Sequence, residues 1–203
     1  GPNGELNRRI AHDCDGIVCG LYEYYASYMA HFDQKEKLTH IPFPIIIEPH
    51  TANERTPKPI RFFIGIQRSR SAYKGTDIML AALEKLHSRY PAQTEIIRAE
   101  NIPFARYKQM MQRSDVILDQ LYSYTPAMNA LQAMSQGLVL VGGAEPEHYQ
   151  LMNEPDLRPI INVQPTEESV FETLEQLVLH PDCIPGLKRE SIAYIYGGSK
   201  QKC

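Results

Sequence analysis

The sequence predicts an α/β fold, in which a doubly wound parallel sheet carries helices on both faces. From residue 61 onward, short apolar runs alternate with segments of helical periodicity, which is the order expected of repeated βαβ units. The first of these runs, RFFIGI, is wholly apolar after its first residue and therefore indicates a buried strand. Because crossovers between parallel strands are right-handed, successive units are expected to wind helices onto both sides of the sheet.

The individual elements follow from local patterns along the chain. Strands are expected at residues 61–66, 94–99, 115–120, 138–143 and 160–163. Helices are expected at residues 76–90, from Pro103 onward, from Thr125 and Pro126 to Gly137, and after Thr166. Threonine is a favourable N-cap residue and glycine commonly follows the last turn of a helix, so these residues mark helix ends.

The first 60 residues have a different organisation. Residues 15–20 have the pattern of a strand, residues 21–32 that of a tyrosine-rich helix, and residues 39–47 are extended, since their prolines exclude a central helix. This unit is too small to hold a core alone, so it either extends the main sheet or is the tail of another domain. The expected division is a unit at residues 1–47, a polar, proline-rich linker at 48–60, the main domain at 61–182, and a C-terminal helix and tail at 183–203.

Composition and charge argue against several classes of protein. The formal net charge is -3, whereas a general nucleic-acid binder usually carries a basic face. No apolar run approaches the ~20 residues that a membrane-spanning helix needs. The four cysteines form no CxxC pair and share no metal-like spacing with histidine. Reduced thiols, a cytoplasmic location and no bound metal are therefore expected.

A basic loop follows the first strand of the main domain. The loop carries Arg68, Arg70 and Lys74, and no acidic residue lies between residues 61 and 76. A loop that runs from a strand into a helix offers free backbone N–H groups to an anion, and arginine and lysine add charge. The alternative is that these cations are simply solvated. The loop is not a Walker A motif, because Lys74 precedes its glycine and the upstream glycine spacing is absent.

Two further segments end at the same edge of the expected sheet. The helix start at Thr125–Ala127 provides a second helix N-terminus beyond the carboxyl end of a strand. The pair Gly142-Gly143 lets the backbone approach a ligand, and Glu145 could accept hydrogen bonds from sugar hydroxyls. Ligands of doubly wound sheets bind beyond the carboxyl ends of the strands, so these features are considered as one site.

The ordered series of motifs resembles the C-terminal, donor-binding half of a retaining GT-B glycosyltransferase, of the large group 1 family that uses nucleotide-diphosphate sugars. The series comprises the strand IGI, the basic loop, KG at a helix start followed by DxxLxA, SDVILD at 114–119, the helix end QAMSQG at 132–137, and GG followed by glutamate. Upstream, CDGIVCGLYEYY resembles the last strand and helix of the family's acceptor domain, and HIPFPI the strand that enters the hinge. The resemblance implies that residues 61–182 bind the donor and that residues 1–47 are a remnant of the acceptor domain.

The resemblance also implies a role for each matching position. Arg70 and Lys74 would stabilise charge on the leaving diphosphate, with Arg68 as the alternative arginine. Donor contacts would come from Gly65, Arg68, Arg70, Lys74, Gly75, Tyr124, Thr125, Pro126, Ala127, Gln132, Gly142, Gly143 and Glu145. The implied reaction moves a sugar to an acceptor hydroxyl with retention, needs no metal or cofactor, and belongs to polysaccharide biosynthesis.

Partners follow from the same resemblance. The acceptor, a saccharide or a lipid-linked one, would bind mainly to a domain outside this chain, so the isolated chain is expected to turn over little. No nucleic-acid partner is expected, and peripheral membrane association of a longer protein fits this assignment.

The family carries two glutamates eight positions apart, and here Tyr124 and Gln132 stand at the matching positions. Two alternatives therefore stay open: a non-catalytic nucleotide-sugar or anion-binding module, and a sugar-nucleotide epimerase of similar fold.

Overall fold

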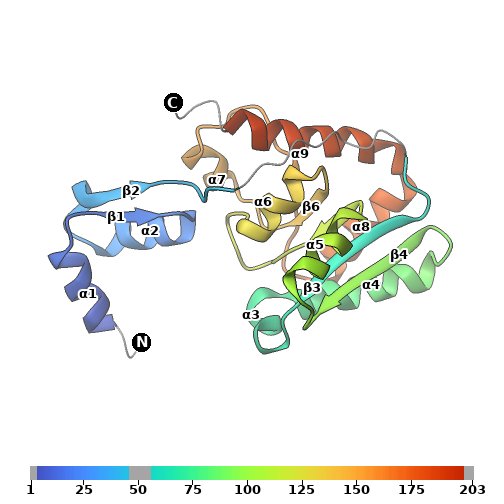
Figure 1. Ribbon diagram of the computed structural model, residues 1–203, viewed down its shortest axis with the longest axis horizontal. Helices are drawn as coiled ribbons and strands as arrows, with labels where there is room; N and C mark the ends of the chain where they lie inside the picture. Colours follow the sequence, from blue (N-terminus) through green and yellow to red (C-terminus); the bar gives the residue numbers. More distant parts are fainter. Residues whose placement is uncertain (1–3, 46–55, 199–203) are drawn as a thin grey trace.

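The computed structural model describes residues 4–45 and 56–198, which form a small N-terminal unit and a larger Rossmann-like domain (Figure 1). The N-terminal unit comprises α1 (Gly4–Asp13), β1 (Ile17–Cys19), α2 (Tyr22–His31), a 3-10 turn (Lys35–Lys37) and β2 (Leu38–His40). Its two strands pair in parallel and form a sheet of their own, separate from the main sheet. The end of the extended segment expected at 39–47 and most of the linker expected at 48–60 lie outside the described residues.

The main domain contains five parallel strands, as the sequence predicts. The strands are β3 (Ile60–Ile66), β4 (Thr94–Glu100), β5 (Val116–Leu118), β6 (Val139–Gly142) and β7 (Ile160–Asn162). The helices are α3 (Ser71–Lys74), α4 (Thr76–Arg89), α5 (Phe104–Gln112), α6 (Met128–Ser135), α7 (Pro146–Leu151), α8 (Glu167–Leu179) and α9 (Ile184–Gly198). The strand order is β4-β3-β5-β6-β7, and every neighbouring pair is parallel.

Helices cover both faces of this sheet, so the predicted doubly wound fold is confirmed. Side chains that alternate along one strand belong to opposite layers: Phe62 joins the core under α4 and α8, and Phe63 joins the core under α5, α6 and α9. Both phenylalanines are fully buried. Since the strands are covered on both sides, they contain the nearly unbroken apolar runs by which they were predicted.

The strand order places a topological switch point between β3 and β5. The chain moves outward from β3 to β4, and then crosses to the other side of β3 to form β5. The connections that leave β3 and β5 therefore diverge to opposite faces, which opens a crevice beyond the carboxyl ends of these two strands. The basic loop expected to bind an anion leaves β3 at this edge.

A buried ionic cluster ties the last helix to the opposite edge of the sheet. Asp115, which is fully buried before β5, accepts hydrogen bonds from the Arg61 side chain at 2.9 and 3.1 Å and from its backbone N–H. Lys188 of α9, only 3% exposed, donates to the same carboxylate at 2.7 Å. Burial alone would raise the pKa of Asp115, but these hydrogen bonds outweigh it and lower the pKa.

Some helix ends differ from the sequence-based expectation. Thr166 caps α8 as expected, with its hydroxyl accepting from the Ser169 N–H at 3.2 Å. The helix expected to start at Thr125 and Pro126 instead begins at Met128, and no side chain caps it. The Thr125 hydroxyl instead donates to Glu23 of the N-terminal unit, and this contact holds Thr125 in the loop before α6.

The remaining differences are additions. Helices α1, α3 and α7 are formed by segments to which the sequence patterns assigned no helix.

In the described part of the chain, no helix is long and apolar enough to cross a membrane. The cysteines of the described ranges, Cys14, Cys19 and Cys183, are free thiols, and Cys203 lies outside those ranges.

Candidate functional site

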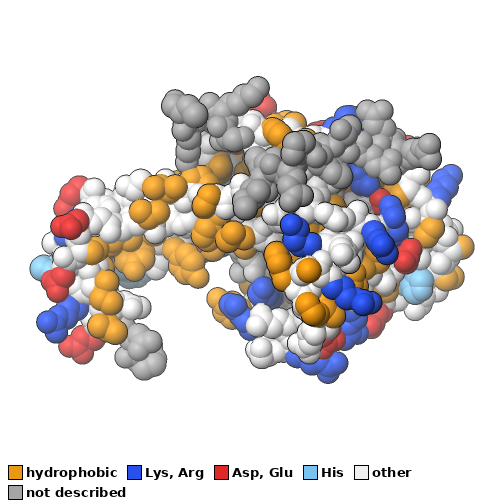
Figure 2. Space-filling view, in the orientation of Figure 1, with side chains coloured by type: hydrophobic (Ala, Val, Ile, Leu, Met, Phe, Trp, Pro, Cys, Tyr) orange, Lys and Arg blue, Asp and Glu red, His pale blue; other side chains and the backbone are white. Residues whose placement is uncertain are grey.

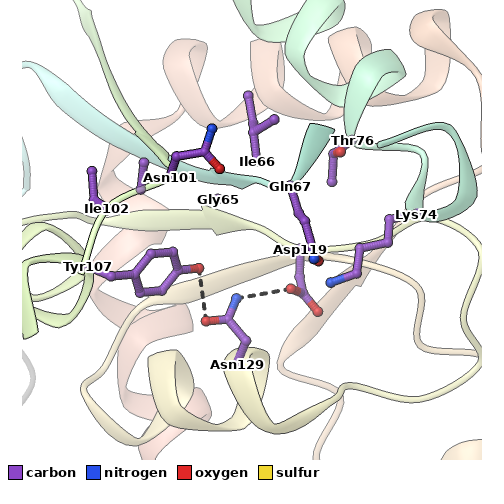
Figure 3. A pocket seen from close by; sticks show the side chains of 11 residues that line it. Gly65, Ile66, Gln67, Lys74, Thr76, Asn101, Ile102, Tyr107, Asp119 and Asn129 are labelled. Carbon is purple, nitrogen blue, oxygen red and sulfur yellow. Dashed lines mark hydrogen bonds between the residues drawn. The ribbon is translucent and has the colours of Figure 1, made fainter. Parts of the chain in front are cut away.

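A pocket of about 290 Å³ lies at the switch point, beyond the carboxyl ends of β3, β4 and β5 (Figure 3). It is lined by Gly65, Ile66, Gln67, Lys74, Thr76, Ala99, Asn101, Ile102, Tyr107, Asp119 and Asn129. Each contributing strand supplies the residues at or just after its end, while α3, α4, α5 and α6 supply the others. The volume is close to the lower end of the range for small-ligand sites, about 300 to 1,000 Å³.

A chain of hydrogen bonds fixes one wall of the pocket. The Tyr107 hydroxyl donates to Asn129 Oδ1 at 3.0 Å, and Asn129 Nδ2 donates to Asp119 Oδ1 at 3.1 Å (Figure 3). The Tyr107 ring packs edge-on against Phe63, with the ring centroids 4.9 Å apart. An ionised Asp119 can only accept, so it takes the Asn129 amide N–H, and this leaves Asn129 Oδ1 to accept from the Tyr107 hydroxyl.

The electrostatics of the pocket are set by Asp119 and Lys74. Burial raises the pKa of Asp119, and the hydrogen bond from Asn129 and the charge of Lys74 oppose that rise. Burial also raises the pKa of Tyr107 to about 12, and the Asp119 charge contributes to this shift. Lys74 is the one cation among the side chains that line the pocket. In the described part of the chain, no carboxylate lies close enough to Lys74 to form an ion pair.

Two glycines of the predicted site shape this region. A Cβ atom at Gly65 would lie 2.5 Å from the Tyr107 hydroxyl, so only glycine leaves room for that side chain in the pocket wall. Gly75 joins α3 to α4 with φ of 72°, a left-handed conformation that L-residues rarely adopt. This turn places Lys74 at the pocket and directs α4 away beneath the sheet.

The two arginines of the basic loop lie outside the pocket lining. Arg68 forms an ion pair with Glu100 at the end of β4, although its side chain is 76% exposed. The guanidinium of Arg70 lies 5.4 Å from the centroid of the Tyr73 ring. Of the three cations expected to face the diphosphate, the structure therefore brings Lys74 to the pocket, and it places the two arginines on the loop surface.

The loop before α6 binds a carboxylate of the chain itself. Glu23 of α2 accepts hydrogen bonds from the backbone N–H groups of Tyr124 and Thr125 and from the hydroxyls of Ser123 and Thr125, the last at 2.7 Å. Burial alone would raise the pKa of Glu23, but these hydrogen bonds outweigh it and lower the pKa. Of the amides expected to face a phosphate at Thr125–Ala127, that of Thr125 is thus occupied by a carboxylate of the N-terminal unit.

Close packing explains the glycine pair after β6. A Cβ atom at Gly143 would lie 1.8 Å from the Ser123 carbonyl oxygen, and one at Gly142 would lie 3.1 Å from the Gln120 oxygen. The Gly143 N–H donates to Gln120 at 2.9 Å. The pair therefore holds the loop after β6 tightly against the loop after β5, outside the pocket lining.

The other predicted residues also lie away from the lining. Gln132 directs its amide nitrogen to the Ser135 hydroxyl at 3.2 Å. Glu145 is the N-cap residue of α7, and its backbone N–H donates to the Tyr124 carbonyl at 3.2 Å. Residues 126–127 form the turn between the Glu23-bound loop and α6. Gly65 and Lys74 are therefore the predicted site residues that the structure brings into the pocket.

Several lining residues escaped the sequence-based prediction. The strand expected at residues 115–120 includes Asp119, and the expected helices include Tyr107 and Asn129 without assigning either a role. Asp119 and Asn101 each lie just after a strand of the parallel sheet, and a polar residue at that position is a usable signal for a ligand site at the carboxyl edge. Nothing in the sequence indicated that Tyr107 and Asn129 would be linked by a hydrogen bond.

No group of three or more potential metal ligands occurs within residues 4–45 and 56–198.

Comparison with known proteins gives the chain the fold of a GT-B glycosyltransferase half. It superposes on TarM with a TM-score of 0.73 at 10% identity, covering 97% of this chain and 43% of TarM. For WaaG, a glycosyltransferase involved in lipopolysaccharide biosynthesis, the TM-score is 0.61 at 13% identity, covering 88% of this chain and 58% of WaaG. For HepE from Anabaena, solved with UDP and glucose, the TM-score is 0.66 at 12% identity, covering 99% of this chain and 67% of HepE.

These similarities define the fold of the chain. The chain spans about half the length of the first solved structures that it matches. No protein-family model matches the chain, and no curated protein matches it by sequence. The predicted resemblance to the donor-binding half of a GT-B glycosyltransferase is thus confirmed as a fold, and the activity follows from the site as a proposal.

Proposed function

We propose that the chain is the donor-binding part of a glycosyltransferase that moves a sugar from a nucleotide-diphosphate sugar to an acceptor hydroxyl. The observation that carries this proposal is the pocket at the switch point of a GT-B-like sheet, with Lys74 as its cation. Solved proteins of this fold hold UDP together with a sugar, as HepE does with glucose and pneumococcal GtfA with GlcNAc. We extend that ligand class to this chain.

In this proposal Lys74 binds the diphosphate and stabilises the charge that develops as the nucleotide leaves. A preorganised cation in a partly buried site stabilises such charge more than it would in water. The amides of Gln67 and Asn101 lie in the same lining and can donate and accept hydrogen bonds to the nucleotide. The transfer is proposed to retain the anomeric configuration. It is also proposed to need no metal, with Lys74 supplying the positive charge at the leaving diphosphate.

The N-terminal unit is proposed to be the end of an acceptor domain. A two-stranded sheet cannot hold a core, and its unit exposes large apolar side chains, among them Val18 at 64%, Tyr24 at 58% and Ile41 at 49%. Figure 2 shows apolar side chains along this unit. Residues 1–47 are therefore proposed as this remnant, 48–60 as the linker, 61–182 as the donor domain, and 183–203 as the C-terminal helix and tail. The acceptor, a saccharide or a lipid-linked saccharide, would bind between the two domains.

The test is a donor panel assayed with the protein as its organism produces it. UDP-, GDP- and ADP-sugars are offered with and without a chelator, and the product anomer is determined by NMR. Lys74→Met is expected to lower kcat by ~100-fold or more, since one lost charge-stabilising contact has an effect of that order. Lys85→Met, which removes a surface cation on α4 paired with Glu167, serves as the control and should leave kcat unchanged. Nucleotide binding without transfer from any donor would refute the enzymatic part of the proposal.

A further inference from the structure

We infer that binding of a nucleotide diphosphate in this pocket is coupled to the uptake of one proton by Asp119. The inference rests on the proposed function, because it assigns a regulatory property to the same site. Its basis is the placement of one carboxylate and one lysine in the lining of a single small pocket (Figure 3). An anionic ligand at Lys74 must come close to that carboxylate.

The hydrogen-bond chain leaves one oxygen of Asp119 available for the proton. Asp119 Oδ1 accepts from Asn129, whose amide is oriented by the Tyr107 hydroxyl. Within the described residues, no hydrogen bond reaches Asp119 Oδ2. A proton taken from solvent would therefore reside on Oδ2, where it turns an acceptor into a donor. A neutral Asp119 can then donate a hydrogen bond to a phosphate oxygen, whereas the ionised form repels it.

The charges around Asp119 determine the direction of the effect. Burial raises the pKa of Asp119, while the hydrogen bond from Asn129 and the charge of Lys74 on α3 favour its ionised form. A diphosphate bound to Lys74 offsets the positive charge that favours the ionised carboxylate of Asp119. It also adds negative charge and displaces water from the pocket. All three changes favour the protonated acid.

No other acid of the lining can take this role. Tyr107 of α5 is the second acidic side chain facing Asp119, and burial raises its pKa to about 12, so it stays protonated. The neighbouring side chains from the β3 loop and from α6, Gln67 and Asn129, do not titrate. Proton uptake on binding is therefore assigned to one carboxyl group.

Calorimetry of the wild-type chain tests the inference. The chain is titrated with UDP-, GDP- and ADP-glucose in buffers that differ in ionisation enthalpy, and the slope of heat against that enthalpy gives the protons taken up. We expect uptake of up to one proton, and an affinity that weakens by up to tenfold for each pH unit at alkaline pH. Saturable binding with zero slope would overturn the inference and leave the proposed function intact. No binding of any nucleotide sugar would overturn both.

Variants and a truncated ligand locate the proton. Asp119→Asn is expected to abolish the slope and to flatten the pH dependence, while Asp156→Asn, which changes an exposed aspartate elsewhere, should keep both. The free nucleoside lacks phosphates and should bind without proton uptake. Uptake that persists in Asp119→Asn, or that accompanies the nucleoside, would contradict the assignment. If Asp119→Asn does not fold, the wild-type protein still tests the assignment. The slope of heat against ionisation enthalpy should then show proton uptake with the nucleotide sugar and none with the nucleoside.

Discussion

Acid should destabilise this protein through one buried histidine. His148 of α7 is 6% exposed, and its Nε2 lies 2.8 Å from the Tyr194 hydroxyl of α9 in a hydrogen bond. Burial lowers the pKa of His148 from 6.5 to about 4, and Glu23 opposes this shift while His40 and Arg158 add to it. The folded protein therefore keeps this ring neutral at pH values where the unfolded chain would protonate it.

The sign and size of the effect follow from linkage. Because the folded pKa lies below the unfolded one, the stabilisation is fully present above the unfolded pKa and is lost as the pH falls toward the folded pKa. The shift from 6.5 to about 4 corresponds to about 3 kcal/mol in full, at about 1.4 kcal/mol for each pKa unit. Between about pH 7 and about pH 5, the protein should lose about 2 kcal/mol of unfolding free energy through this group.

Urea denaturation at several pH values measures this loss. Wild type and His148→Gln are compared between about pH 7 and about pH 5, where most carboxylates stay ionised. The variant should be less stable at neutral pH but should lack the ~2 kcal/mol pH-dependent term. His180→Gln, which changes an exposed histidine after α8, controls for histidine loss in general. An equal pH dependence in wild type and His148→Gln would refute the reasoning.

Two further perturbations probe the contacts that join the parts of the chain. Asp115→Ala should cost about 3 to 5 kcal/mol of unfolding free energy, because it leaves Lys188 buried without a counter-charge, and Lys188→Met should cost less, since Asp115 keeps its arginine. Equal costs in urea denaturation would contradict this account. Glu23→Ala should leave the N–H groups of the loop before α6 without a partner and speed hydrogen exchange at Thr125, whereas Glu36→Ala, which removes an exposed carboxylate, should not. Unchanged exchange at that amide would show that the contact does not hold the loop.

The sheet could be predicted because its signals are local. Each strand is a short apolar run, and burial on both faces makes such runs continuous, as in residues 60–66 and 139–142. The contact that holds the loop around Thr125 could not be predicted from local pattern, because its partner Glu23 lies 102 residues away in sequence. Helix α7 was missed, although Pro146 stands in its first turn, where proline is favoured.

The site could be predicted in outline only. Sequence order indicated the correct edge of the sheet, and Lys74 and Gly65 lie in the pocket as the basic loop and its strand suggested. The positions of Arg68 and of the Tyr124 amide depend on partners, Glu100 and Glu23, that are remote in sequence. The tertiary structure determines which charged groups remain available to a ligand, so no local sequence pattern can predict them.

The central claim is that a nucleotide diphosphate binds at the switch-point pocket. Amide chemical-shift mapping by NMR during a titration with UDP tests it most directly, because each lining segment reports separately. We predict saturable shifts at Gly65, Gln67, Asn101 and Asp119, and weaker binding in Lys74→Met. Saturable shifts confined to other parts of the chain, or no shifts with UDP, GDP or ADP, would contradict the account.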